Sequence, residues 1–228
     1  MARSRACAGR PLVAETWTDR ALATRSSFPD ATWNRAVARL LAGRLAEAWP
    51  DAEARFDVQG AQASRLPRHR RWRGEAASRK TLLLFAEQGL GDTVQFCRYA
   101  PLAARRGLRT VLAVQVPLVP LRKTLDGMAD VVVLDGNGPD HDWNCTLMSL
   151  PGLFGTTAET VPVAIPYLAP QDAGRRAWRE RLGAARALRA GLCWQGNPAH
   201  RDDRRTPFPS RLLTASVGYG MSSSCPCG

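Results

Sequence analysis

The chain has 228 residues, enough for one ordinary domain and part of a second. Its formal net charge is +12, and all but two of its 32 basic residues are arginines, scattered through a background rich in alanine, glycine and proline. Because no nucleic-acid readout motif accompanies this charge, we expect no nucleic-acid binding, and charge-driven attachment to RNA or a membrane surface is the weaker alternative.

The six cysteines lack the spacing of metal ligands, and we expect neither a metal site nor a disulfide framework. Cys97 and Cys193 fall inside apolar segments and are predicted to be small core residues. The N-terminus has arginines but no apolar leader, and no segment is apolar enough for a membrane span. These features predict a cytoplasmic protein.

Two short helices are predicted over residues 31–57, with a break at Gly43. Their inward positions are Trp33, Ala36, Val37, Leu40 and Leu41, followed by Leu45, Ala48, Trp49 and Phe56. The small residues around a turn glycine resemble a tetratricopeptide helical hairpin, so we assign residues 1–57 to a partial helical-repeat region that could bind a protein partner. Residues 58–79 follow as a linker, and its basic run "RLPRHRRWRG" (65–74) is predicted to be solvated.

Apolar runs and helical patterns alternate after residue 80. Strands are predicted at 81–87, 109–115, 129–135, 142–150 and 190–197, helices at 92–106, 117–125 and 171–183, and an extended segment at 161–168. Helices between strands require crossover connections, and these favour a parallel sheet. We therefore predict an α/β fold with a Rossmann-like parallel sheet, preceded by the helical hairpin.

The loop "EQGLGD" joins the first strand to the next helix. Gly89 and Gly91 would let the backbone approach a ligand there, although the loop is neither a dinucleotide fingerprint nor a Walker loop. Asp92 is predicted to be a helix N-cap, with Gln95 completing a capping box, or alternatively to act chemically in a cleft. Glu87 could face either a ligand or the solvent.

The sequence on both sides of this loop is a more specific signal than the loop alone. "KTLLLFAEQGLGDTVQFCRYAPLAARRG", preceded by "RWRG" and followed by "DWNCTLMSLPGLFGTT", resembles the glycosyltransferase-like region of bacterial tetratricopeptide-repeat proteins, which are similar to heptosyltransferases. The resemblance continues in "IPYL" (165–168) and "GLCWQGNPAHRDDRR" (191–205) and covers about residues 20–205. Such proteins look like two-lobed GT-B transferases. Residues 80–185 would then be the acceptor lobe, and residues 186–228 the start of the donor lobe.

The resemblance implies inverting transfer from a nucleotide-sugar to a hydroxyl of a glycan or protein acceptor, with no further cofactor. Asp92 would be the general base that takes the proton of the acceptor hydroxyl. Neighbouring substrate-binding positions would be Glu87, Gln88, Gly89, Gly91, Thr93 and Gln95. Groups for the donor phosphates would be Asn197, His200, Arg204 and Arg205.

The resemblance ends at about Arg205, where "RRTPFPSRLLTAS" departs from the family pattern. The sequence after Arg211 has no charged residue. We therefore predict a truncation or a reading-frame change in the donor lobe, and no sugar-nucleotide turnover by this chain alone. The alternative function is that of a non-catalytic scaffold, in which the helical repeats and a lone Rossmann-like lobe bind other proteins.

Overall fold

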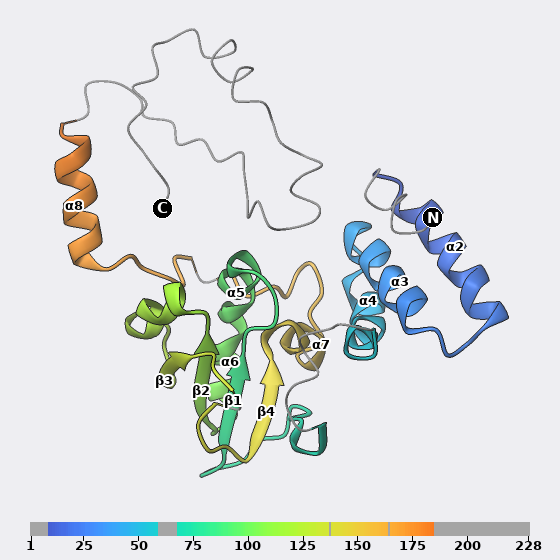
Figure 1. Cartoon of the computed structure of the whole chain (residues 1–228), viewed down its shortest axis with the longest axis horizontal. Helices are drawn as coiled ribbons and strands as arrows, with labels where there is room; N and C mark the ends of the chain where they lie inside the picture. The colour runs from blue at the N-terminus through green and yellow to red at the C-terminus, as the bar shows by residue number, and fades with distance from the viewer. Residues whose placement is uncertain (1–8, 59–67, 137, 164, 185–228) are drawn as a thin grey trace, which may run out of the picture. The chain divides into compact units, whose positions relative to one another are not determined.

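The computed structural model describes residues 9–58, 68–136, 138–163 and 165–184 (Figure 1). The chain divides into two compact units, Met1–Arg175 and Arg176–Gly228. The first unit holds a helical segment and an α/β segment with a four-stranded, all-parallel sheet, so the predicted α/β class and parallel sheet are confirmed. The predicted strand at 190–197 lies outside the described residues.

The described elements follow one another in a simple order. The helical segment contains α2 (Pro11–Thr24), α3 (Pro29–Leu41), α4 (Leu45–Ala52) and the 3₁₀ turn η1 (Glu53–Phe56). The strands are β1 (Thr81–Phe85), β2 (Arg109–Val114), β3 (Met128–Val133) and β4 (Trp143–Thr146). The remaining helices and turns are η3 (Arg68–Arg70), α5 (Leu90–Phe96), η4 (Cys97–Tyr99), α6 (Ala100–Ala104), η5 (Val116–Lys123), η6 (Leu147–Ser149), α7 (Leu150–Leu153) and α8 (Asp172–Leu182).

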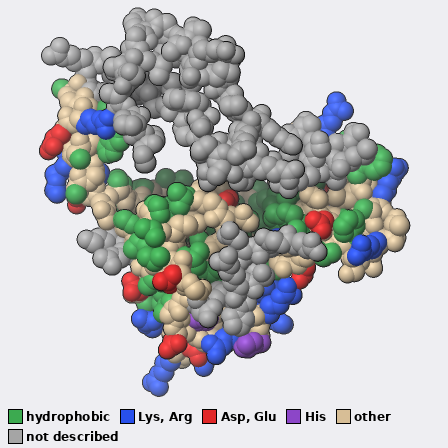
Figure 2. All heavy atoms as spheres, viewed as in Figure 1, with side chains coloured by type: hydrophobic (Ala, Val, Ile, Leu, Met, Phe, Trp, Pro, Cys, Tyr) green, Lys and Arg blue, Asp and Glu red, His purple; other side chains and the backbone are tan. Residues whose placement is uncertain are grey.

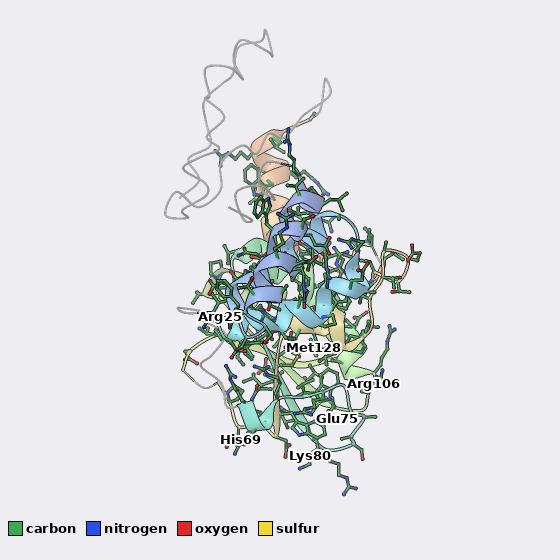
Figure 3. All side chains as sticks on the ribbon, turned by 90° about the vertical axis from the view of Figure 1, so that its right-hand side faces the viewer. Arg25, His69, Glu75, Lys80, Arg106 and Met128 are labelled. Atoms are coloured by element: carbon green, nitrogen blue, oxygen red, sulfur yellow. The ribbon has the colours of Figure 1, made fainter. Side chains whose placement is uncertain are left out.

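The strand order in the sheet is β3-β2-β1-β4, with β2 and β1 as the two inner strands. Leu84 of β1 lies opposite Leu112 of β2 and Cys145 of β4. Figure 3 shows Glu75 and Lys80 at the lower end of the sheet, where the strands begin, and there Lys80 Nζ lies 2.7 Å from Asp142 Oδ1. The opposite end, where the strands finish, is the end at which parallel sheets bind ligands.

The strand predicted at 142–150 and the helix predicted at 92–106 have different bounds in the structure. The strand expected at 142–150 ends at Thr146, because the chain turns into η6 and α7. The helix expected at 92–106 begins earlier, at Leu90, and is broken by a 3₁₀ turn before α6. Pro101 lies in the first turn of α6. Since proline has no N–H and its ring crowds the carbonyl four residues back, a continuous α-helix is unfavourable there. The segment at 161–168 forms no strand among its described residues.

The core lies on both faces of the sheet, as expected for continuous apolar strands. Leu82, Leu84 and Leu112 face one cluster, which includes Cys97, Cys145 and Leu150. The alternating positions form a smaller cluster on the other face, made of Leu83, Phe85, Val111 and Ala113. Cys97 is therefore a core residue, as predicted, and burial raises the pKa of its thiol to about 12, which keeps the sulfur neutral. Cys193 lies outside the described residues.

Small residues bring the helices close together. Ala14 of α2 and Ala38 of α3 are completely buried and form one cluster, and Ala36 and Ala48 are buried as predicted. Gly43, at φ +77°, makes the predicted break between α3 and α4. Leu41 was expected to face inward and is instead 60% exposed, since α3 ends at this residue.

Ion pairs with acidic side chains balance the positive charge of several arginines. Asp51 binds Arg35 at 2.6 Å and Arg39 at 2.9 Å, and Glu15 binds Arg39 and Arg44. On the face in Figure 2, the described Lys and Arg side chains are scattered among acidic ones and form no single basic patch. Within the described segments, no helix has the length and apolar character to cross a bilayer, and no cluster of three His, Cys, Asp or Glu side chains could hold a metal ion.

Trp72 corrects the prediction that residues 65–74 are solvated throughout. The ring is only 1% exposed and joins the main core, where it meets Phe154 edge-on at 6.1 Å. Its backbone N–H donates to the Asn144 carbonyl at 2.9 Å, and its indole N–H donates to the Glu75 carbonyl at 2.9 Å. The backbone hydrogen bond to Asn144 holds the segment beside β4. Trp72 can be buried there because its backbone N–H and its indole N–H both have acceptors.

We expect Trp72→Ala to lower the free energy of unfolding by about 3–5 kcal/mol, because a large buried aromatic side chain leaves a cavity. The matched control is Trp178→Ala, since Trp178 is 51% exposed and its loss is expected to change stability by about 0.5 kcal/mol or less. Urea unfolding measures both variants. Similar values for the two would contradict the placement of Trp72 in the core.

Candidate functional site

The loop after β1 lies at the carboxyl end of the sheet and leads into α5. Gly89 is the N-cap of α5, with an extended backbone, and Asp92 is the third residue of the helix. Asp92 Oδ2 accepts a hydrogen bond from the Gly89 N–H at 3.0 Å. Asp92 therefore does cap the helix, but from inside its first turn. The expected N-cap at Asp92 and its pairing with Gln95 are wrong, because the helix begins at Leu90.

The two loop glycines are exposed, and neither has a positive φ. A Cβ added at Gly91 would meet nothing within 4 Å, and one at Gly89 would meet only Asp92 Oδ2 at 3.5 Å. Their backbone conformation therefore does not require glycine. What the missing side chains do provide is an open surface around the Asp92 carboxylate.

Gln115, which follows β2, fixes the loop from the neighbouring strand. Its side-chain amide donates to the Gln88 carbonyl at 2.8 Å and accepts from the Thr93 hydroxyl at 3.0 Å. Thr93 is only 2% exposed, so its hydroxyl supports the loop from within. Gln115 was not among the predicted site residues, although a polar residue directly after a buried strand is a signal for one.

Glu87 is buried at the end of β1, and its side chain is 1% exposed. Oε1 accepts a hydrogen bond from Arg55 Nε at 3.0 Å, so the solvent-facing alternative for Glu87 is wrong. Oε2 has no hydrogen-bond partner within the described structure. Burial raises the pKa of this carboxyl group above its usual range, and the nearby Arg55 charge opposes that shift only in part.

Arg55 connects the helical segment to the ends of two strands. Its Nη1 donates to the Ala52 carbonyl and to Glu53 Oε1, both at 2.8 Å. Its Nη2 donates to the hydroxyls of Thr146 and Ser149, at 2.8 and 2.7 Å. The guanidinium also lies 4.2 Å from the centre of the Phe56 ring. Arg55 was not among the predicted site residues, because a single arginine in a helical pattern gives no sign of partners so far along the chain.

The predicted site residues thus separate into three groups. Gln88, Gly89, Gly91 and Gln95 are exposed, and Asp92 is half-buried among them. Glu87 and Thr93 are buried and hold the loop from behind. Asn197, His200, Arg204 and Arg205, the predicted donor-phosphate groups, lie outside the described residues.

Comparison with known proteins gives no family for the chain: no protein-family model, no curated protein and no solved structure matches it. The function must therefore be argued from the residues and geometry of the carboxyl edge.

We expect the natural chain to lose stability relative to the Glu87→Gln variant as pH rises above about 4.5. The unfolded carboxyl group loses its proton near that pH, whereas the folded group, with a raised pKa, still holds it. The natural chain therefore loses stability until the folded pKa is passed, and the glutamine variant lacks this loss. Urea unfolding between pH 3 and 8 measures the difference.

The control is Glu159→Gln at the exposed Glu159. A hydrogen bond from the Thr157 hydroxyl lowers the pKa of this carboxyl group in the folded chain. The ionised Glu159 therefore stabilises the folded chain above the unfolded pKa, and this stabilisation is lost as pH falls through the folded pKa. The sign of the pH dependence is therefore opposite and its window lies below about pH 4.5. A pH-independent difference for Glu87→Gln would contradict the raised pKa.

Proposed function

We propose that the α/β segment is the acceptor lobe of an inverting, GT-B-type glycosyltransferase, with Asp92 as the general base. The observation that supports this most directly is the Asp92 carboxylate, half-buried among exposed loop residues at the carboxyl end of a parallel sheet. Its Oδ2 is oriented by the Gly89 N–H, and Oδ1 makes no hydrogen bond within the described residues. One oxygen is thus fixed while the other is available to a substrate.

The proposed reaction needs little from this lobe besides a base and an acceptor surface. As the acceptor hydroxyl oxygen attacks the anomeric carbon, its proton passes to Asp92 and the bond from that carbon to the nucleotide diphosphate breaks. The new glycosidic bond forms on the opposite face, so the configuration inverts. Gln88, Gly89, Gly91 and Gln95 would contact the acceptor, and Glu87 and Thr93 would hold the loop in place.

The remaining parts of the proposal rest on the resemblance in sequence. The donor would be a nucleotide-sugar, and its diphosphate would meet Asn197, His200, Arg204 and Arg205. The helices α3 and α4 would correspond to a tetratricopeptide-like hairpin.

A second candidate function is that of a non-catalytic scaffold. Three apolar side chains on α2 favour it, since Leu12, Val13 and Trp17 are 64%, 38% and 40% exposed. Neighbouring apolar side chains exposed on one helix suit the docking of another protein.

The test is a titration of the full chain with a panel of oligosaccharides, followed through backbone amide shifts in NMR. We expect shifts at residues 88–95, and their loss in Gly91→Phe, whose new side chain would cover the loop. Gly174→Phe is the matched control, because a Cβ at Gly174 also meets nothing within 4 Å and the residue lies on α8. Shifts confined to α2–α4 would favour the scaffold instead, and shifts that persist in Gly91→Phe would contradict the proposed acceptor site.

This chain alone is expected to show no transfer, so the base is tested in the chain supplemented with a complete donor lobe. There, Asp92→Asn is expected to lower the transfer rate by roughly 100-fold or more, since the amide cannot accept the proton. The asparagine oxygen can still accept the hydrogen bond from Gly89, so the cap is retained. Transfer that persists at the natural rate in Asp92→Asn would rule out Asp92 as the base.

A further inference from the structure

A cavity of about 380 Å³ lies between α4, η1, β4 and α7, away from the Asp92 loop. Its apolar lining includes Trp49, Phe56, Trp72, Phe85 and Leu153. None of residues 88–95 lines it. The volume falls within the range of small-molecule sites in proteins, which begins at about 300 Å³.

The polar groups inside the cavity are already occupied by the protein itself. The Thr146 and Ser149 hydroxyls accept hydrogen bonds from Arg55, and Ser149 donates to Glu53 Oε1 at 2.7 Å. The indole N–H of Trp49 donates to the Thr156 carbonyl at 2.7 Å, and that of Trp72 is also bonded. The interior therefore offers a ligand mainly ring surfaces and hydrocarbon, which suits an apolar, flat body.

The polar side chains with remaining capacity are the charged ones, and most of them are cationic. The Arg71 guanidinium lies 3.9 Å from the centre of the Phe56 ring, which holds it in place, and 3.6 Å from Glu53 Oε2. The other oxygen of Glu53 is bound by Arg55 and Ser149. Arg73 is exposed, also lines the cavity and has no ion pair among the described residues. Two arginines thus line the cavity, together with one carboxylate that is already engaged.

We propose that this cavity binds a small aromatic acid, with its ring against the tryptophan and phenylalanine side chains and its carboxylate at Arg71 and Arg73. Guanidinium groups bind carboxylates through paired, charge-assisted hydrogen bonds, so the acid is preferred over a neutral compound of the same shape. This site is separate from the acceptor surface around Asp92, so acid binding does not depend on the proposed transferase function.

The test uses 5-fluoroindole-3-acetate and its neutral counterpart 5-fluoroindole-3-ethanol, with fluorine NMR of the full chain. We expect the acid to bind, and the alcohol to bind roughly ten-fold or more weakly. Arg71→Gln is expected to weaken the acid by a similar factor and to leave the alcohol unchanged. Arg109→Gln is the matched control, since Arg109 is exposed at the start of β2 and does not line the cavity.

A second pair of variants tests the location. Ala46 is exposed and lines the cavity, so Ala46→Phe should fill its entrance and abolish binding without disturbing the core. Ala169→Phe places the same side chain at an exposed position outside the cavity and should bind the acid normally. The proposal is overturned if the acid does not bind, if acid and alcohol bind equally, or if Ala46→Phe binds as the natural chain does.

Discussion

The arrangement of helices and sheet depends on the hydrogen bonds that the buried Arg55 guanidinium makes. This guanidinium is almost fully buried and reaches Glu87 at the end of β1, Thr146 at the end of β4 and Ser149 beyond it. A buried charge is tolerated only where opposite charge and hydrogen bonds replace water. Each partner of Arg55 must therefore be in place for the others to be stable, and this requirement fixes η1 against the carboxyl edge of the sheet.

Two regions with different properties follow from that fixed edge. The loop after Glu87 carries the half-buried Asp92, and Gln115 and Thr93 hold the loop in place. The hydrogen bonds from Arg55 occupy the hydroxyls of Thr146 and Ser149, which leaves the cavity that these residues line with an apolar interior. One buried arginine thus supports the proposed acceptor surface and shapes the proposed acid-binding cavity.

The sheet could be predicted because its strands are continuous apolar runs, whereas the interactions around it could not. Glu87 and Arg55 are 32 residues apart, and Arg55 and Thr146 are 91 apart, so no local pattern signals either pair. Trp72 lies among arginines, which concealed its place in the core. A helix at Asp92 was predicted, but neither its start at Leu90 nor its end at Phe96 was. The start was missed because a carboxylate can cap a helix from the N-cap or from the third position.

A double-mutant cycle at Arg55 and Glu87 tests the central claim most directly. Arg55→Met should lower the free energy of unfolding by about 3–5 kcal/mol, because it leaves the Glu87 carboxyl group buried without its partner. Glu87→Met should cost less, because Arg55 keeps its ion pair with Glu53. The double variant should lose less than the sum of the two by roughly 1.5 kcal/mol or more. Losses that add to within about 0.5 kcal/mol would show that the two side chains are not coupled and would contradict the account.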